Sequence, residues 1–246
     1  MKILVCISKT PDTTAKISFT ADNKECNSAG VPYILNPYDE WYSLVRALEL
    51  TEKHGGSVTV INVGGADNET LIRKALAIGA QDAVRIDAEP RSALFVAKQI
   101  AEFARDKGFD AIFCGKETID YNGSEVGPMI AEMLGLPFLS FVNHLELEGS
   151  KAKASRDIEG GSEVVEVELP FVLSAAKGMA EQRIPNMMGI MKAKQKPLQV
   201  VTPAGFEDKA KIAAYELPPA KSSVKLIDPE NMDELVRLLH EEAKVI

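Results

Sequence analysis

Residues 39–63, DEWYSLVRALELTEKHGGSVTVINV, decide the fold of this chain. Apolar side chains recur at helical spacing over residues 39–54, and the pair Gly55-Gly56 ends that pattern. The β-branched run at 57–63 follows directly and predicts a buried strand. A helix that leads into a buried strand is half of a βαβ unit, in which parallel strands are joined by a covering helix.

The same alternation continues on both sides of this segment. The buried run KILVCIS at 2–8 predicts a strand before it. Further strands are predicted at 82–87 and 109–114, and further helices at 67–78 with Asp67 as the cap, at 92–107, and up to Leu134 before Gly135. Strands separated by single helices predict right-handed crossovers, and so an α/β fold with a doubly wound, mostly parallel sheet.

The pattern changes after residue 138. The segments 144–150 and 162–169 alternate apolar with charged residues, which predicts a small antiparallel extension with one face in water. A buried strand is expected again at 171–176. Residues 197–227 hold four prolines and few periodic apolar residues, and an amphipathic helix is expected at 229–243 with Pro229 near its start. We therefore expect a domain at 1–196 and an extended arm at 197–246.

Composition excludes several classes of function. The chain has 36 acidic residues against 28 Lys and Arg, a net charge of -8, which disfavours nucleic-acid binding. Its three cysteines form no CxxC pair, and this favours a reduced, cytoplasmic protein. The three histidines lack metal-ligand spacing, so no metal site is expected. No nucleophile motif is present either, so we expect no catalytic residues.

Open parallel sheets bind ligands beyond the carboxyl ends of their strands. This rule selects the loops after Ser8, around Asn36, at 63–65 and at 115–127. The last one, GKETIDYNGSEVG, supplies hydroxyl groups and leads into a helix whose first N–H groups suit a phosphate. Neither a phosphate loop nor GxGxxG occurs. The residues alone leave two interpretations open, a nucleotide-binding loop and a plain loop that caps a helix.

A second unusual segment is RIPNMMGIMKAK at 183–194, which holds three methionines. Methionine-rich surfaces occur where one protein meets several partners. Composition alone nevertheless favours the start of a helix that faces the core. The basic cluster Lys192, Lys194 and Lys196 is expected to be a solvated face.

Residues 154–174, ASRDIEGGSEVVEVELPFVLS, carry a family resemblance. They resemble the signature of the electron transfer flavoprotein beta subunits: a basic residue, an acidic-Gly-Gly turn, a glutamate, then a proline before an apolar pair and a small residue. These positions are Arg156, Glu159-Gly160-Gly161, Glu163, Pro170, Val172-Leu173 and Ser174. Asn36-Pro37, the 115–127 loop and the stretch from Arg183 to Lys194 also match. The resemblance covers about residues 2–200.

The resemblance implies a fold of the adenine-nucleotide-binding type that holds one AMP. FAD would be held mainly by an alpha subunit, with Tyr38 approaching the flavin across the interface. Glu125 stands where other members have Gln, and Val126 where they have Thr. A carboxylate near a phosphate is unfavourable unless Glu125 points away or Lys116 compensates. The implied cofactor-binding residues are Cys6, Asn36, Pro37, Tyr38, Asp39, Val63, Gly115, Thr118, Asp120, Gly123, Ser124, Glu125 and Val126.

The resemblance also implies the partners. The chain would be an electron carrier subunit, not an enzyme, in a heterodimer with the alpha subunit. It would pass electrons from flavin dehydrogenases, such as the acyl-CoA dehydrogenases of fatty acid β-oxidation, toward a membrane quinone oxidoreductase. The 183–194 segment becomes a recognition loop with Met187 as its anchor, and the arm is expected to wrap the alpha subunit. The implied docking residues are Glu163, Arg183, Met187, Met188 and Ile190.

Two alternatives stay open at this point. Some related proteins hold a second FAD in place of AMP and bifurcate electrons from NADH, and the loops at 10–13 and 123–127 resemble those members somewhat. The other alternative is a stand-alone nucleotide-binding sensor or hydrolase. The segment 197–227 argues against it, because so few apolar residues cannot form a core of their own.

Overall fold

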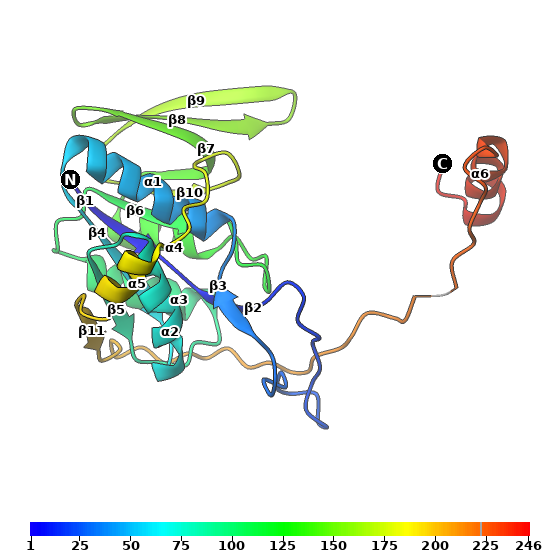
Figure 1. Ribbon diagram of the computed structural model, residues 1–246, viewed down its shortest axis with the longest axis horizontal. Coiled ribbons are helices and arrows are strands. Elements are labelled where there is room, and N and C mark those ends of the chain that lie inside the picture. The colour runs from blue at the N-terminus through cyan, green and yellow to red at the C-terminus, as the bar shows by residue number, and fades with distance from the viewer. Residues whose placement is uncertain (222) are drawn as a thin grey trace.

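The computed structural model describes residues 1–221 and 223–246. A nine-stranded sheet in the order β11-β5-β4-β1-β6-β10-β7-β8-β9 runs through the body (Figure 1). Pairing is parallel from β11 to β7 and antiparallel over the last three strands, which confirms the predicted sheet and its extension. The strands are β1 Lys2–Cys6, β4 Ser57–Val63, β5 Asp82–Ile86, β6 Ala111–Gly115, β7 Phe138–Glu148, β8 Lys151–Ile158, β9 Gly161–Glu168, β10 Phe171–Ala175 and β11 Leu198–Val201. A separate antiparallel pair joins β2 Lys9–Pro11 to β3 Tyr33–Leu35.

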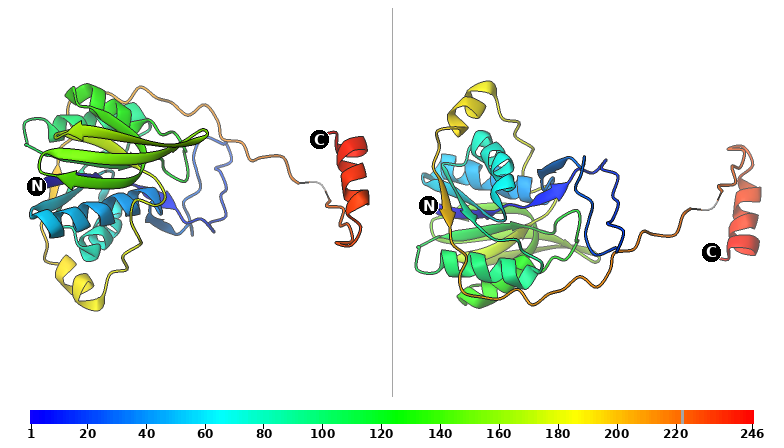
Figure 2. Two further views of the ribbon diagram at one scale, coloured as in Figure 1. Left: turned by 90° about the horizontal axis from the view of Figure 1, so that it is seen from above. Right: turned by 90° about the horizontal axis from the view of Figure 1, so that it is seen from below.

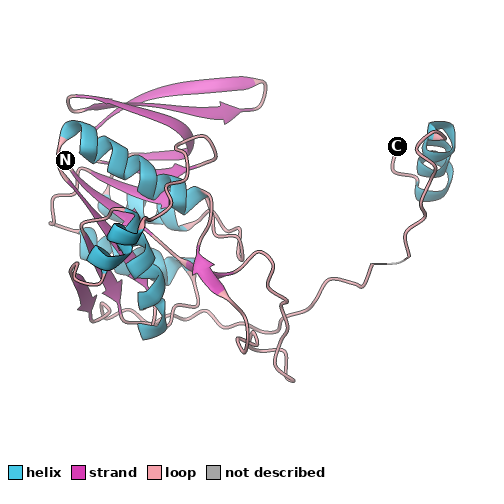
Figure 3. Cartoon of the chain, in the orientation of Figure 1, coloured by secondary structure: helices cyan, strands magenta, loops and turns pink. Residues whose placement is uncertain are grey.

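Helices cover both faces of the sheet (Figures 2 and 3). One layer holds α1 Asp39–His54 and α2 Glu69–Ile78, and the other holds α3 Ala93–Ala104 and α4 Val126–Leu134. Alternate residues of β1 face opposite layers, because Ile3 and Val5 belong to the core under α1 while Leu4 and Cys6 belong to the core under α3. The sheet is therefore doubly wound.

The topology reverses at β1. The chain passes from β1 to β4 and β5 on one side and then returns to β6 on the other side of β1. Val5 pairs with Phe113, so the carboxyl ends of β1 and β6 lie next to each other. Open α/β sheets bind ligands in the crevice at such a switch point.

Two expected helix starts were wrong. Asp67 does not cap α2, because Ala66–Asn68 form a 3-10 turn and the Asp67 carboxylate pairs with Lys9 instead. The terminal helix, α6 Met232–Leu238, begins three residues after Pro229 and continues as the π-helical segment η2 Leu239–Ala243. The Asn231 side chain accepts a hydrogen bond from the amide of Glu234 and sets that start.

Four of the described strands were not predicted, namely the short pair β2 and β3 and the strands β8 and β11. β8 lies between turns at Gly149 and Gly160, both with positive φ, and the alanine-rich run KAKAS that opens it lacks the usual β-branched signal. β11 lies inside the segment expected to be an irregular arm. It pairs with β5 from Leu198 opposite Ala83 to Val201 opposite Ile86 and closes that edge of the sheet.

The arm after β11 is fastened to the body as far as Tyr215. Gln99 and Ala204 exchange two hydrogen bonds, of 3.1 and 2.7 Å. Asp208 accepts from the amide and hydroxyl of Ser92 at the start of α3. Tyr215 stacks on Phe19 with ring centroids 4.9 Å apart. Figure 1 shows that the described chain beyond this point leaves the body and ends in α6.

Lys196 was expected to belong to a solvated face, and this expectation was wrong. Its ammonium group donates to three carbonyl oxygens at the end of α2, those of Leu76 at 2.8 Å, Gly79 at 3.3 Å and Ala80 at 2.5 Å. Burial lowers the pKa of this amine. Lys196 therefore satisfies carbonyls that have no partner within the helix.

Replacement of this amine is expected to destabilise the fold. Lys196→Met keeps most of the side-chain volume but leaves partly buried carbonyls without a donor, which costs about 1–3 kcal/mol. Urea denaturation measures the effect. Lys194→Met is the control, since Lys194 is exposed, and its midpoint should stay within error of the parent. Equal midpoints for the two variants would contradict this role.

Within the described ranges, 1–221 and 223–246, we find no helix with the length and apolar character needed to span a membrane.

Candidate functional site

The switch-point crevice is built around Asn36. This side chain is fully buried; its amide nitrogen donates to the carbonyl of Glu117 at 3.0 Å, and its amide oxygen accepts from the N–H of Ile119 at 3.1 Å. One side chain therefore ties the residues that precede α1 to the loop that follows β6. This contact brings together two of the segments that the sequence had selected, around Asn36 and at 115–127.

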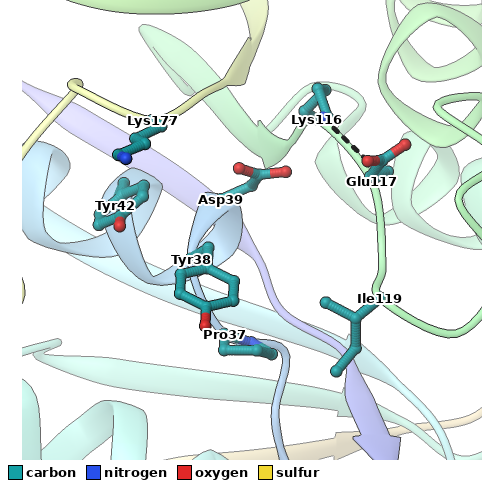
Figure 4. A pocket seen from close by; sticks show the side chains of 8 residues that line it. All are labelled: Pro37, Tyr38, Asp39, Tyr42, Lys116, Glu117, Ile119 and Lys177. Carbon is teal, nitrogen blue, oxygen red and sulfur yellow. Dashed lines mark ion pairs between the residues drawn. The ribbon is translucent and has the colours of Figure 1, made fainter. Parts of the chain in front are cut away.

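A cavity of about 310 Å³ opens beside this clamp (Figure 4). Lys116 and Glu117 face each other across its upper edge, with Nζ and Oε1 2.8 Å apart. Its lining is Pro37, Tyr38, Asp39, Tyr42, Lys116, Glu117, Ile119 and Lys177. Sequence reasoning missed Lys177, although the residue follows β10 and the rule on strand ends could have selected it.

Tyr38 and Asp39 begin α1 at this cavity. Tyr38 has φ 61°, in the left-handed region, and half of its side chain is exposed. A bulky residue with positive φ is strained, and such residues gather at functional sites. Burial raises the pKa of the Asp39 carboxyl. The aromatic ring is thus available for contact with another molecule.

The loop from 118 to 126 is also strained. Asn122 and Ser124 both have positive φ, 51° and 53°, and the amide of Asn122 bonds to the carbonyl of Thr118 at 2.9 Å. Glu125 precedes α4 without a side-chain cap, so the amides of Val126 and Gly127 have no capping acceptor, while Pro128 has no N–H. The Gly123 backbone and the Asp120 and Glu125 side chains are exposed, and Val126 begins the helix.

Glu125 was expected either to point away from the phosphate or to have its charge compensated by Lys116, and the second of these does not occur. Lys116 pairs with Glu117, so this cation is already engaged and does not compensate Glu125. The Glu125 side chain is exposed to solvent, where water screens its charge. The Ser124 hydroxyl in the same loop donates to the Glu117 carboxylate at 3.4 Å.

Cys6 and Val63 end β1 and β4, and neither lines the cavity. Both side chains are buried at the ends of their strands. Hydrogen bonding to the thiol of Cys114, together with burial, raises the pKa of Cys6 well above its usual range. The Cys6 thiol is therefore a neutral packing group, and it is not a reactive one.

Glu40 is a further residue at this switch point that the sequence did not reveal. Only 5% of it is exposed, and its two carboxylate oxygens accept from the amide and hydroxyl of Ser8 at 2.6 and 2.7 Å. Burial raises the pKa of this carboxyl to about 8. An acidic residue in the first turn of a helix is ordinary, because it favours the helix dipole. Only the pattern of the assembled sheet shows that this one is buried.

The predicted docking residues fall into two separate groups. The first is α5, Met187–Ala193, which packs on α2, and it leaves 74% of Met187 and 63% of Met188 exposed together with much of Ile190. Composition had favoured a core-facing helix here, and that expectation was wrong. Arg183 forms two hydrogen bonds with the Glu52 carboxylate, at 2.6 and 3.1 Å, and so fixes the chain that leads into α5.

The second group lies on the hairpin formed by β8 and β9 at the edge of the sheet. Glu163 on β9 pairs with Arg156 on β8, with Oε2 and Nε 2.5 Å apart. Arg156 also donates to the hydroxyl of Ser140 at 2.6 Å. The hairpin forms the opposite edge of the sheet from β11, so Glu163 does not belong to the same surface as Met187.

Comparisons with known proteins agree with this architecture. The electron transfer flavoprotein domain family matches residues 25–205. An electron transfer flavoprotein subunit beta from Bacillus subtilis is 36% identical over 260 residues, covering 100% of both chains. The subunit beta from Syntrophomonas wolfei is 37% identical over 232 residues, covering 94% of this chain and 91% of that one. The human subunit beta is 30% identical over 256 residues, covering 100% and 99%.

Proposed function

The chain belongs to the electron transfer flavoprotein family as a beta subunit, and we propose that it holds one AMP as a structural ligand while an alpha subunit holds most of the FAD. FAD supplies the electron-carrying chemistry of the pair. This subunit would position the flavin, and it would dock the proteins that donate and accept electrons. It would act in the cytoplasm as a carrier and would make or break no bond of a substrate.

The Asn36 clamp carries the nucleotide assignment. It joins the residues before α1 to the loop after β6 at the switch point, where open α/β sheets bind ligands, and this supports the proposal. The amides of Val126 and Gly127 at the start of α4 suit a phosphate, and the hydroxyl of Thr118 suits a phosphate or ribose. Tyr38, strained and half exposed, would face the flavin side.

Nucleotide analysis tests this assignment. The purified heterodimer is denatured, and the released compounds are separated and counted. We expect one AMP and one FAD per heterodimer. Denatured samples without any adenine mononucleotide would refute the structural AMP.

The exposed methionines of α5 support the docking role. Gly189 packs this short helix tightly on α2, since a Cβ there would lie 2.5 Å from the carbonyl oxygen of Ala77. The helix is therefore fixed while its outer side chains stay free. Unbranched thioethers adapt to different pockets, which suits a surface that meets several flavin dehydrogenases, including acyl-CoA dehydrogenases, and a membrane quinone oxidoreductase.

Met187→Ala is expected to slow electron transfer from a dehydrogenase by about 10- to 100-fold, because truncation of a central anchor costs about 2 kcal/mol or more. Assembly with the alpha subunit should not change. Stopped-flow flavin reduction measures the first quantity, and size-exclusion chromatography measures the second. Leu94→Ala removes an exposed apolar side chain from α3, in the helix layer on the other face of the sheet, and it should leave the rate within error of the parent. A parental rate for Met187→Ala would remove this residue as the anchor.

The hairpin and the arm supply the remaining proposed contacts. Glu163 would meet a partner through a carboxylate that Arg156 already holds in place. The arm from 197 onward would wrap the alpha subunit. Its first part, from β11 to Tyr215, is bound to the body of this chain. Residue 222 of the arm lies outside the described residues.

A further inference from the structure

Glu40 lies between the carboxyl ends of β1 and β6, at the switch point where open α/β sheets bind ligands. Its carboxylate fills the space between the end of β1, through Ser8, and the end of β6, where Gly115 touches it. A Cβ on Gly115 would lie 2.7 Å from Cγ of Glu40 and 2.9 Å from its backbone nitrogen. The acidic group is therefore held in the switch-point crevice from both sides and cannot turn away.

The contact with Ser8 can exist in two protonation states. When Glu40 is ionised, the Ser8 hydroxyl donates to it; when Glu40 is neutral, the same hydroxyl can accept from the protonated carboxyl. The amide of Ser8 donates in both cases. The side chain thus keeps its position whichever charge it has, and only the electrostatic character of the crevice changes.

The groups around Glu40 are mostly acidic. Asp39 precedes it on α1, and Asp120 faces it from the loop after β6; both raise its pKa, although less than burial does. In that same loop Lys116 pairs with Glu117, so its charge is largely taken up. From β1, the thiol of Cys6 is the neighbouring titratable group and is neutral. A phosphate that enters would add negative charge to a site where, among the described residues that line the cavity, Lys177 is the cation without an ion pair.

We propose that Glu40 sets the charge that this crevice accepts: when it is neutral it admits the phosphate of a mononucleotide, and when it is ionised it repels that phosphate, so nucleotide binding takes up a proton. This inference rests on the proposed AMP site and adds a proton-linked control to it. The raised pKa of Glu40, about 8, places the change within an accessible range of pH. Adenosine carries no phosphate and should bind without this dependence.

Titration calorimetry tests the proposal with the full-length chain after removal of endogenous nucleotide. Between about pH 7 and about pH 9 the AMP phosphate is already a dianion, so its own titration does not interfere. The AMP affinity of the parent should fall by up to about tenfold per pH unit above the pKa of Glu40. Two buffers of different ionisation enthalpy should show net proton uptake of up to about half a proton at the midpoint, rising toward about one proton at higher pH.

Glu40→Gln removes the charge at nearly constant shape and should make the AMP affinity independent of pH. Ser8→Ala removes a group that favours the ionised form, so it should move the midpoint to higher pH. The unmodified chain gives the proton uptake, and so the proposal can be tested even if Glu40→Gln does not fold. A flat AMP profile for the parent, or a parallel decline in Glu40→Gln, would overturn the proton link and leave AMP binding intact. Absence of AMP binding at every pH would overturn the proposed AMP site, and this inference with it.

Discussion

Gly115→Ala is expected to lower the affinity for AMP by about 10- to 100-fold and to destabilise the fold by about 1–3 kcal/mol. The added methyl group would lie 2.7 Å from Cγ of Glu40 and 2.9 Å from its backbone nitrogen. The nitrogen belongs to the first turn of α1, which cannot shift without moving the helix. Relief of the clash would therefore separate α1 from β6 and open the crevice that Asn36 closes.

Gly205→Ala is the matched control, because it makes the same change outside the proposed site. A Cβ there would meet no atom within 4 Å, and the residue is not in the left-handed region. We expect parental stability and AMP affinity within about twofold, since a surface change of this kind costs at most about 0.5 kcal/mol. Equilibrium dialysis with AMP and urea denaturation measure both variants. Equal losses in the two would show that the contact with Glu40 does not govern binding.

Removal of residues 218–246 is expected to weaken association with the alpha subunit by at least about 100-fold. Met232 and Val236 of the terminal helix α6 are exposed. Within the described residues, α6 lies away from the body of the protein (Figure 1). Burial of two such side chains in an interface contributes about 3 kcal/mol or more, equivalent to this change in affinity. Analytical ultracentrifugation of the co-purified subunits measures it.

The shortened chain should itself fold normally. Its last anchors, the Gln99 pair with Ala204, Asp208 at Ser92 and the Tyr215 ring on Phe19, all remain. Circular dichroism and the urea midpoint should therefore match the parent. A shortened chain that assembles with parental affinity would contradict the proposal that this segment wraps the alpha subunit.

Local signals were sufficient for much of the fold. The bounds of α1 and β4 match the predicted bounds, because Gly55-Gly56 ends the helical spacing of apolar residues and a β-branched run follows directly. α4 ends before Gly135, which has the left-handed conformation expected of a helix terminator. In each case the decisive residues lie within a few positions of the boundary.

Long-range contacts determined what the sequence did not show. β11 is a strand because β5 offers an open edge more than 100 residues earlier in the chain. Lys196 is half buried because the end of α2 lies beside it, and Glu40 is buried because the loops after β1 and β6 close over it. A charged residue looks the same in sequence whether its partners are water or distant backbone groups.

In the candidate site, too, local signals selected the segments, and long-range contacts determined how they meet. The rule on strand ends selected the segments around Asn36 and at 115–127, and the structure places them in contact through one amide side chain. Neither that clamp nor the carboxylate beneath it follows from residue type. For α5, composition predicted burial, whereas Gly189 allows a close approach to α2 that leaves the methionines outside.

Native mass spectrometry of the heterodimer tests the central claim most directly, because it weighs the assembled pair with its ligands in place. We predict a mass that corresponds to the two subunits plus one FAD and one AMP. A complex with two FAD molecules would instead indicate the electron-bifurcating type, and a complex that carries FAD but no second adenine compound would contradict the assignment of the switch-point crevice to AMP.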